Sequence, residues 1–561
     1  MKVCLLIIGL IISIHGKAQT LSIEVPNNAY GIDETLFLIV SRIQDMENYQ
    51  DIGNYDEILI ALGGDEYSFI SNPESLAYSN SYTVENTSSL DQYILYFTEL
   101  PLVMIDSEEA IVDEPKILAS LIYTDDQQTI NSNIGIELRG GFSQSYPKKT
   151  YDLEFWEDEN GDETIDFQIG GLREDDDWIL DALYNEPIRL RSYVASKLWK
   201  EMHSPYYINE EEEAKSGADV MYVELFLNGL YNGIYNISEQ IDRKQLKLKK
   251  YSGEMKGELY KGSSWGGAVT FEELPSYNNE DRFWGGYEFK YPSEDAITDW
   301  NNIYEFTEFV MYSPKPDFES NIWSEFSKDN FIDYFLFLNL ILAIDNTGKN
   351  IYVAKYKADE LYFYVPWDLD GCFGTNWEGK NLNFTGGILT NGFMDRVINL
   401  NSDNTFIHLA EKWFEYRDNL FSNDYLLGSI SELYNYFQTN KIYERESIVY
   451  TNYAFDDQSL DYILNWLESR LEYLDTYFES VLSAEMPLSP TTLTIYPNPA
   501  KDEVYISSID DFSGKSYKIV NNLGQLVSTG TLISEQILIE KLGSGIYFLF
   551  IDGISFKLIK N

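Results

Sequence analysis

Four oxygen-bearing side chains stand in a fixed order in the stretch from Phe331 to Gly374. Asp345 follows an apolar segment with helical spacing, and Asn350 comes five residues later. Asp368 and Asp370 then follow two short apolar runs, 351–356 and 361–367, which predict a hairpin. Phosphoryl transfer needs such a set, because a carboxylate must accept the proton of the attacking hydroxyl and hard oxygen ligands must hold Mg²⁺.

The order of helix, Asp, Asn, hairpin and Asp is also the order of parts in the catalytic half of a protein kinase. It predicts Asp345 as the base, Asn350 as one metal ligand, and Asp368 or Asp370 as the second metal ligand. The alternative is that these are ordinary polar residues of an acidic chain, in which the last two aspartates merely end a strand.

A lysine in an alternating segment adds a candidate phosphate contact. In the predicted strand 148–155, a period of two places Lys149 on the same face as Tyr151, Leu153 and Phe155. An inward lysine needs an anionic partner, and a phosphate oxygen of ATP is one. The alternative is an aliphatic stem whose amine reaches the rim of the apolar face.

Three longer motifs carry a family resemblance. They are RGGFSQSYPKKTY at 139–151, YVELFLNGLYNGIY at 222–235 followed by SEQID at 238–242, and VPWDLDG at 365–371. In this order they resemble the landmark motifs of the CotH family of atypical spore-coat-type protein kinases, from about residue 100 to residue 480. The resemblance implies a divergent kinase-like fold that uses ATP and Mg²⁺, with Mn²⁺ as the alternative metal.

The same resemblance implies further nucleotide contacts. Arg139 opens the first motif, Arg191 stands where the family carries a comparable arginine, and Glu239 lies near the end of the second motif. Surface solvation is the alternative role for Arg191. The glutamate that would pair with the inward lysine stays open among three candidates, Glu201, Glu224 and Glu239.

Composition excludes several classes of function. The 561 residues contain 92 acidic and 40 basic side chains, a formal charge of −52, so nucleic acids and anionic lipid surfaces should be repelled. Apart from His15 in the first eighteen residues, only His203 and His408 remain. A zinc site or a Ser-His-Asp triad is therefore not expected.

The two ends of the chain indicate export. Residues 1–18 have a lysine, an apolar run too short to span a membrane and small residues, as a secretory signal peptide does. No later segment is expected to cross a membrane. Residues 493–561, with YPNPA at 496–500, resemble the C-terminal sorting domain of the type IX secretion system. That resemblance implies passage through the periplasm and across the outer membrane, handled by the type IX machinery.

The sequence thus predicts an α+β protein with five parts. They are a signal peptide (1–18), a β-rich lead-in (19–100), a divergent two-lobed protein-kinase-like domain (101–483), a linker (484–492) and a small all-β sandwich sorting domain (493–561).

Two functions remain open from the sequence. One is a secreted or surface CotH-type kinase that phosphorylates Ser or Thr of a protein. The other is a catalytically inactive kinase-like module that binds a glycan or a protein through the abundant aromatic residues, 44 Tyr and 11 Trp. Departures from ordinary kinases give the second function weight, since Ala343-Ile344 replaces His-Arg before the base and Asp370-Gly371 is not Asp-Phe-Gly.

Overall fold

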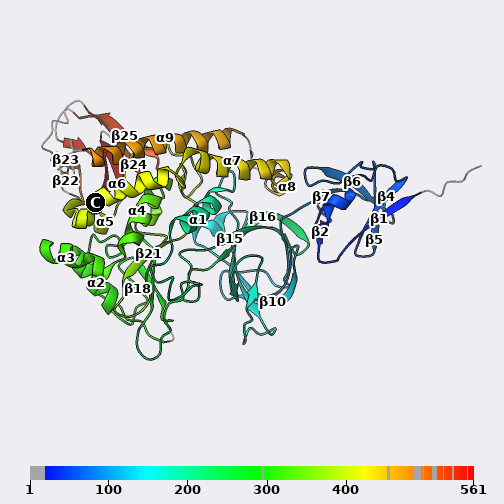
Figure 1. The fold of residues 1–561 in the computed structure, drawn as a ribbon, viewed down its shortest axis with the longest axis horizontal. Coiled ribbons are helices and arrows are strands. Elements are labelled where there is room, and N and C mark those ends of the chain that lie inside the picture. Colours follow the sequence, from blue (N-terminus) through cyan, green and yellow to red (C-terminus); the bar gives the residue numbers. More distant parts are fainter. Residues whose placement is uncertain are drawn as a thin grey trace, which may run out of the picture.

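The computed structural model is an α+β protein with a β-rich N-terminal region, a helical middle and a C-terminal all-β region, as Figure 1 shows. It describes residues 19–293, 296–451, 455, 457–483, 494–496, 498–507, 515–521, 524–532, 536–551 and 554–560. The expected signal peptide and linker lie outside these residues.

The N-terminal region is a seven-stranded sheet in the order β1-β4-β5-β6-β7-β3-β2. Its strands are β1 (Thr20–Val25), β2 (Tyr30–Asp33), β3 (Leu38–Ser41), β4 (Glu57–Leu62), β5 (Asp65–Phe69), β6 (Ser81–Asn86) and β7 (Gln92–Phe97), with a short helix η1 (Met46–Tyr49). One face buries an apolar cluster that includes Ile39, Ile58 and Leu95. The prediction of a β-rich lead-in is confirmed.

A closed barrel follows, in the order β10-β11-β14-β16-β15-β8-β9 (Figure 1). Its strands are β8 (Leu102–Asp106), β9 (Ile117–Thr124), β10 (Thr129–Leu138), β11 (Tyr151–Trp156), β14 (Asp177–Asp181), β15 (Val220–Leu227) and β16 (Leu230–Glu239). A short helix η2 (Phe142–Ser145) and the small strands β12 (Phe167–Gln168) and β13 (Glu174–Asp175) lie in its loops. Asn228 and Gly229 join β15 to β16 with positive φ at both positions, as a tight hairpin requires.

The helical middle surrounds a second sheet in the order β18-β19-β17-β20-β21. These strands are β17 (Glu258–Gly262), β18 (Phe283–Trp284), β19 (Tyr287–Tyr291), β20 (Ile351–Lys355) and β21 (Tyr362–Pro366). The helices are α1 (Arg191–Met202), α2 (Asn301–Tyr312), α3 (Lys315–Glu325), α4 (Lys328–Ile341), α5 (Gly392–Leu400), α6 (Thr405–Arg417), α7 (Asn423–Thr439), α8 (Ile442–Val449) and α9 (Asp457–Leu482), with short η3 (Asp345–Thr347) and η4 (Ser402–Asn404).

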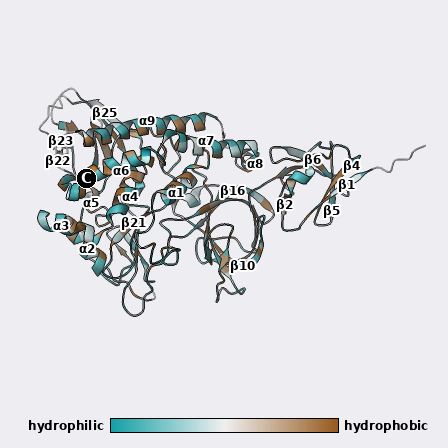
Figure 2. Ribbon diagram, viewed as in Figure 1, coloured by the Kyte–Doolittle hydropathy of each residue, from teal (hydrophilic) through white to brown (hydrophobic). Residues whose placement is uncertain are grey.

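Helix α4 contains the apolar segment with helical spacing that precedes Asp345. The Ser327 side chain caps its first turn by accepting a hydrogen bond from Asn330 N, and Leu342 ends it in a left-handed conformation. Nearly every residue between is buried, because the helix is covered on all sides. In contrast, α9 shows hydrophilic and hydrophobic residues side by side (Figure 2), as expected of a helix with one exposed face.

The C-terminal region has two sheets around one apolar cluster. One sheet contains β22 (Thr494–Tyr496), β23 (Glu503–Ser507) and β26 (Gln536–Leu538), and the other β24 (Ser516–Asn521), β25 (Leu526–Thr531), β27 (Gly545–Ile551) and β28 (Ile554–Lys560). It contacts the helical middle through the Phe384 and Phe550 rings, whose centroids are 5.0 Å apart, and through the ion pair of Lys557 with Glu272.

Candidate functional site

One cavity of about 660 Å³ lies between the barrel, helix α1 and the hairpin β20–β21. Five of the residues predicted from the sequence line it, namely Arg139, Asp345, Asn350, Asp368 and Asp370. Three others, Lys149, Arg191 and Glu239, are not among its lining residues. The four oxygen-bearing side chains of the first motif therefore do converge on one space.

Asp345 begins the short helix η3, three residues after the left-handed end of α4. Its carbonyl oxygen accepts hydrogen bonds from the backbone N of Lys349 at 2.7 Å and of Gly348 at 3.2 Å, which fixes the loop as a tight turn. Burial raises the pKa of the Asp345 carboxyl. The positive charge of Lys349 opposes that rise, and the negative charge of Asp368 adds to it.

Asn350 is held by its backbone at the junction of two strands. Its N donates to the carbonyl of Gly262 at 2.9 Å, and its carbonyl accepts from the backbone N of Trp367 at 3.1 Å and from the Asn346 amide at 2.6 Å. These bonds hold it at a positive φ of 56°. Asparagine is among the residues that tolerate this conformation best, and its amide lines the cavity.

The two aspartates after the hairpin differ in environment. Asp368 is exposed and has a φ of 53°, whereas Asp370 is half-buried and accepts a hydrogen bond from the Asn185 amide. Burial, together with the nearby charge of Asp368, raises the pKa of Asp370 well above its ordinary value. Carboxylate and amide oxygens are the donors that Mg²⁺ takes, so Asn350, Asp368 and Asp370 are a donor set that suits this ion.

The prediction that Lys149 is the inward lysine was wrong. Strand β11 begins at Tyr151, so the period of two does not extend to the two lysines before it. Lys149 is half-buried, and its amine donates to the carbonyls of Gln144 and Tyr146 at 2.6 and 2.5 Å. Lys148 is the lysine that is buried and lines the cavity.

Lys148 lies in a buried charge network. Its amine is 2.7 Å from Glu446 Oε1, which also accepts from Arg189 at 3.1 Å, and it donates to the carbonyl of Ile234. All three charged side chains are fully buried. Burial lowers the pKa of Lys148 to about 8, although Glu446 opposes that shift.

The other predicted contacts do not line the cavity. Arg191 is buried at the start of α1, where its backbone N donates to Glu186 Oε2 at 2.6 Å, while its Nε and Nη1 have no hydrogen-bond partner among the described residues. Burial lowers the pKa of its guanidinium. Glu239 is buried beside Lys215 and accepts from the backbone N of Arg173 at 2.9 Å. The candidates Glu224 and Glu201 contact Arg445 and the Tyr425 hydroxyl, so none of the three glutamates pairs with the buried lysine.

Sequence reasoning missed Asp181, which also lines the cavity. It ends strand β14, accepts from the Thr150 hydroxyl at 3.3 Å, and has a pKa raised by burial and by the charge of Asp368. It also missed Glu446, which lies 298 positions after Lys148. An acidic residue at a strand end is common in this chain, so no local signal marked either residue.

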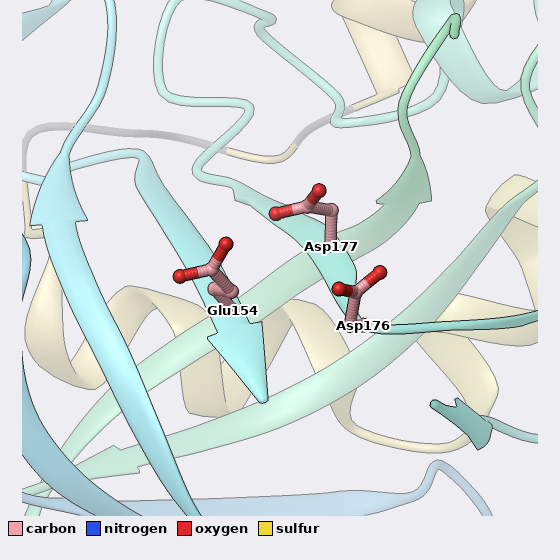
Figure 3. Close-up of side chains that lie close together, drawn as sticks. All are labelled: Glu154, Asp176 and Asp177. Carbon is pink, nitrogen blue, oxygen red and sulfur yellow. The ribbon is translucent and has the colours of Figure 1, made fainter. Parts of the chain in front are cut away.

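A second group of carboxylates lies outside the cavity. Glu154, Asp176 and Asp177 come from β11 and from the start of β14, as Figure 3 shows, and their oxygens lie within 4.8 Å of one another. Two lysines balance the negative charge of this group, because Lys116 is 3.6 Å from Asp177 and Lys244 pairs with Asp176. Burial raises the pKa of Asp177 to about 7. The group is therefore a compensated acidic cluster.

Comparison with known proteins and a search for membrane-spanning helices give three further results. An 80-residue stretch is 38% identical to beta-agarase A of Zobellia galactanivorans, and the match covers 14% of this chain and 15% of that protein. No helix among the described residues has the length and apolar character needed to cross a membrane. Residues 494–561 match the secretion system C-terminal sorting domain, which indicates a secreted or cell-surface protein handled by the type IX secretion machinery.

The central part of the chain matches a second family. Residues 136–474, which include every residue assigned to the cavity above, match the family described as CotH kinase protein. The chain therefore belongs to the CotH kinase protein family.

Proposed function

We propose that the chain is a secreted or cell-surface kinase that transfers the γ-phosphoryl group of ATP to serine or threonine of a protein, with Mg²⁺ or Mn²⁺ as the metal. The observation that carries this proposal is the convergence of Asp345, Asn350, Asp368 and Asp370 on the cavity that also contains Lys148 and Arg139. Lys148 and Arg139 pair with Glu446 and Asp152, and the cavity lining has five basic and five acidic side chains in a chain with a formal charge of −52. This local concentration of cations favours an anionic ligand that is bound together with a metal.

Asp345 is the base in this proposal. Its carboxylate accepts the proton of the serine hydroxyl while the serine oxygen forms a bond to the γ-phosphorus. The bond from that phosphorus to the β–γ bridging oxygen breaks, and ADP leaves. A raised pKa suits a residue that must take up a proton at neutral pH.

Asn350, Asp368 and Asp370 would hold the metal, which when bound neutralises charge on the phosphate oxygens. Lys148 would contact a phosphate oxygen. Its ion pair with Glu446, which also pairs with Arg189, would fix its position. Arg139 would add a second cationic contact from the barrel side. The two-lobed kinase-like arrangement belongs to this proposal, with the barrel on one side of the nucleotide and the hairpin with α4 on the other.

A specific observation also favours the binding module. Phe142 is 58% exposed although it lines the cavity, and its ring meets the Trp377 ring edge-to-face with centroids 4.8 Å apart. Tyr146 and Tyr184 continue this aromatic group. Exposed aromatic rings at a cavity mouth are a binding surface for a glycan or a protein, which an inactive CotH module would use without any transfer.

Calorimetry of ATP binding with and without Mg²⁺ tests the two functions. We expect Mg²⁺-dependent binding by the wild-type chain, and loss of that dependence in Asp368→Ala or Asp370→Ala, whichever supplies the metal ligand. Asp359→Ala, in the exposed turn of the hairpin, is the matched control. Absence of binding by the wild type at millimolar ATP and Mg²⁺ would reject the kinase and leave the binding module.

We further propose that the type IX machinery carries the protein from the periplasm across the outer membrane, as the sorting domain at 494–561 supports.

A further inference from the structure

The cavity has two chemically different ends. One end is lined mostly by small side chains, among them Ser192, Ser196, Gly217, Ala218, Asn236 and Ser238, with Asp181 opposite Asn236 on the paired strand. The other end contains three lysines, Lys261, Lys290 and Lys349, together with Glu288. A recess of small side chains and a basic region within one cavity call for two different ligand groups.

Glu288 is the carboxylate that lies within the basic end, and Asp345 and Asp368 lie beside it. Glu288 lies 3.3 Å from Lys290 and 3.6 Å from Arg282, so it is shared between two cations. Among the residues that the structure describes, the amines of Lys261 and Lys349 make no hydrogen bond or ion pair. Burial lowers the pKa of Lys261, the charges of Arg139 and Lys290 lower it further, and the charges of Glu288 and Asp368 oppose this shift. Partly desolvated lysine amines that make no direct hydrogen bond or ion pair are a site for an anion.

The basic end lies on the side of the proposed base. Lys349 is four residues after Asp345 and close enough to lower its pKa. Lys261 is on β17, directly before Gly262, whose carbonyl accepts the 2.9 Å hydrogen bond from Asn350 N. The recess of small side chains lies instead beside Lys148, since that lysine contacts Ile234 on β16, two residues before Asn236.

This arrangement separates nucleotide from acceptor. If the base of ATP occupies the recess of small side chains and its phosphates extend past Lys148 to the metal ligands, the hydroxyl that attacks must enter from the end that holds Asp345. Whatever carries that hydroxyl then meets Lys261, Lys290 and Lys349. Because the rest of the chain is strongly acidic, these lysines form a local positive region. That region would select between acceptors by their charge.

We propose that the acceptor is an acidic protein segment, in which glutamate or aspartate residues beside the phosphorylated serine or threonine contact Lys261, Lys290 and Lys349. This inference rests on the proposed kinase function and names the substrate class of that site.

The test compares two peptides that differ only in charge, a serine flanked by glutamates and the same serine flanked by lysines. With the full chain, ATP and Mg²⁺, we expect kcat/KM at least about tenfold higher for the acidic peptide. The double variant Lys261→Glu, Lys290→Glu should reverse the preference toward the basic peptide. A misfolded variant cannot gain activity toward a new peptide, so the reversal is diagnostic.

Lys315→Glu is the matched control, because Lys315 is exposed on α3 outside the cavity, and it should leave the peptide ratio unchanged. Calorimetry should show ATP affinity of the double variant within about threefold of wild type.

Weakened ATP binding with an unchanged peptide ratio would overturn the inference and assign these lysines to the phosphates of the nucleotide. Equal rates on both peptides, or a preference for the basic one, would also overturn it. A chain that neither binds ATP nor phosphorylates either peptide would reject the kinase function itself, and the inference with it.

Discussion

At the scale of single residues, Asp345 is the side chain on which transfer depends. Asp345→Asn keeps the size and polarity of the side chain but removes its capacity to accept a proton. We expect the rate of phosphoryl transfer to fall by about 10²–10⁴-fold, with ATP affinity retained, because the base contacts the acceptor and not the nucleotide. Phosphate incorporation into an acidic peptide, together with calorimetry, measures both quantities. Asp359→Asn controls for the loss of one carboxylate, and an active Asp345→Asn variant would assign the base elsewhere.

The pH dependence of transfer should report the environment of Asp345. The base acts when deprotonated, and burial raises its pKa, so activity should increase as pH rises through a value above the ordinary carboxyl pKa of about 4. Lys349 lowers the pKa of Asp345, so Lys349→Met should move the acidic limb of the kcat/KM profile to higher pH. Lys380→Met, at an exposed lysine, is the control. A profile that stays in place in Lys349→Met would contradict this account.

The two adjacent lysines give a sharp comparison. Lys148→Met removes the cation that lines the cavity and leaves Glu446 with Arg189 and backbone donors alone. We expect ATP affinity to fall about tenfold or more and thermal stability to decrease, since a buried charge pair is broken. Lys149→Met should change ATP affinity little, because its amine only bonds two carbonyls of its own loop. Calorimetry on both variants decides, and a larger loss in Lys149→Met would restore the prediction made from the sequence.

At the residue scale, the sequence predicted a common location where a motif fixes both type and spacing. Asp345, Asn350, Asp368 and Asp370 line one cavity, and their roles as base and metal ligands stay predictions. Prediction failed for the lysine, because the onset of a strand decides which of two neighbours is inward and local sequence does not mark that onset. The partner of the lysine, Glu446, comes from a helix far along the chain, where tertiary packing decides the contact.

At the scale of elements, helix α4 supports the hairpin that carries the aspartates. Strand β21 is the edge of its sheet, so its outer backbone groups lack a neighbouring strand. Asn330 replaces that strand in part, because its side chain accepts from Tyr364 N at 2.7 Å and donates to Tyr364 O at 2.9 Å. The helix thereby fixes the end of the hairpin that leads to Asp368.

Asn330→Ala should therefore destabilise the protein. It leaves a buried N–H and C=O of β21 without partners, which costs about 1–3 kcal/mol of unfolding free energy. Urea unfolding measures the loss. Asn321→Ala, in an exposed position of α3, removes an amide that bonds only its own helix and should cost much less. Equal stability of the two variants would show that Asn330 does not hold the strand.

The sequence predicted the helix and hairpin strands that have a local periodicity. It did not predict how the strands close into a barrel. The helix 328–341 and the two strands of the hairpin lie within a few residues of their predicted bounds. The barrel closes through the parallel pairing of β15 with β8, which sets Glu224 opposite Leu102. That pairing joins segments more than a hundred residues apart, so the periodicity of either strand carries no information about it.

At the scale of the whole molecule, the regions are joined with very different strength. A fully buried ion pair of Arg445 with Glu224, which also accepts from the Thr98 hydroxyl at 2.8 Å, joins α8, the barrel and the end of the N-terminal region. The C-terminal region has an apolar cluster of its own, and its described residues contact the helical middle through side chains that include Phe550, Ser555 and Lys557. Folding of the kinase domain should therefore depend on the N-terminal region more than on the tail.

Ending the chain after residue 483 separates export from activity. We expect the shortened protein to bind ATP with an affinity within about threefold of the full chain, because the cavity lies in residues 139–377 and the tail contributes none of its lining. We also expect it to stay on the periplasmic side of the outer membrane, because the sorting domain at 494–561 is absent.

Calorimetry and fractionation of cells that express each form measure the two effects. Lys557→Ala is the matched control, since it breaks the ion pair with Glu272 and the contact with the Trp265 ring, neither of which lines the cavity, and it should change neither effect. Loss of ATP binding on truncation would show that the tail completes the kinase domain, and surface display of the shortened chain would show that another segment directs its export.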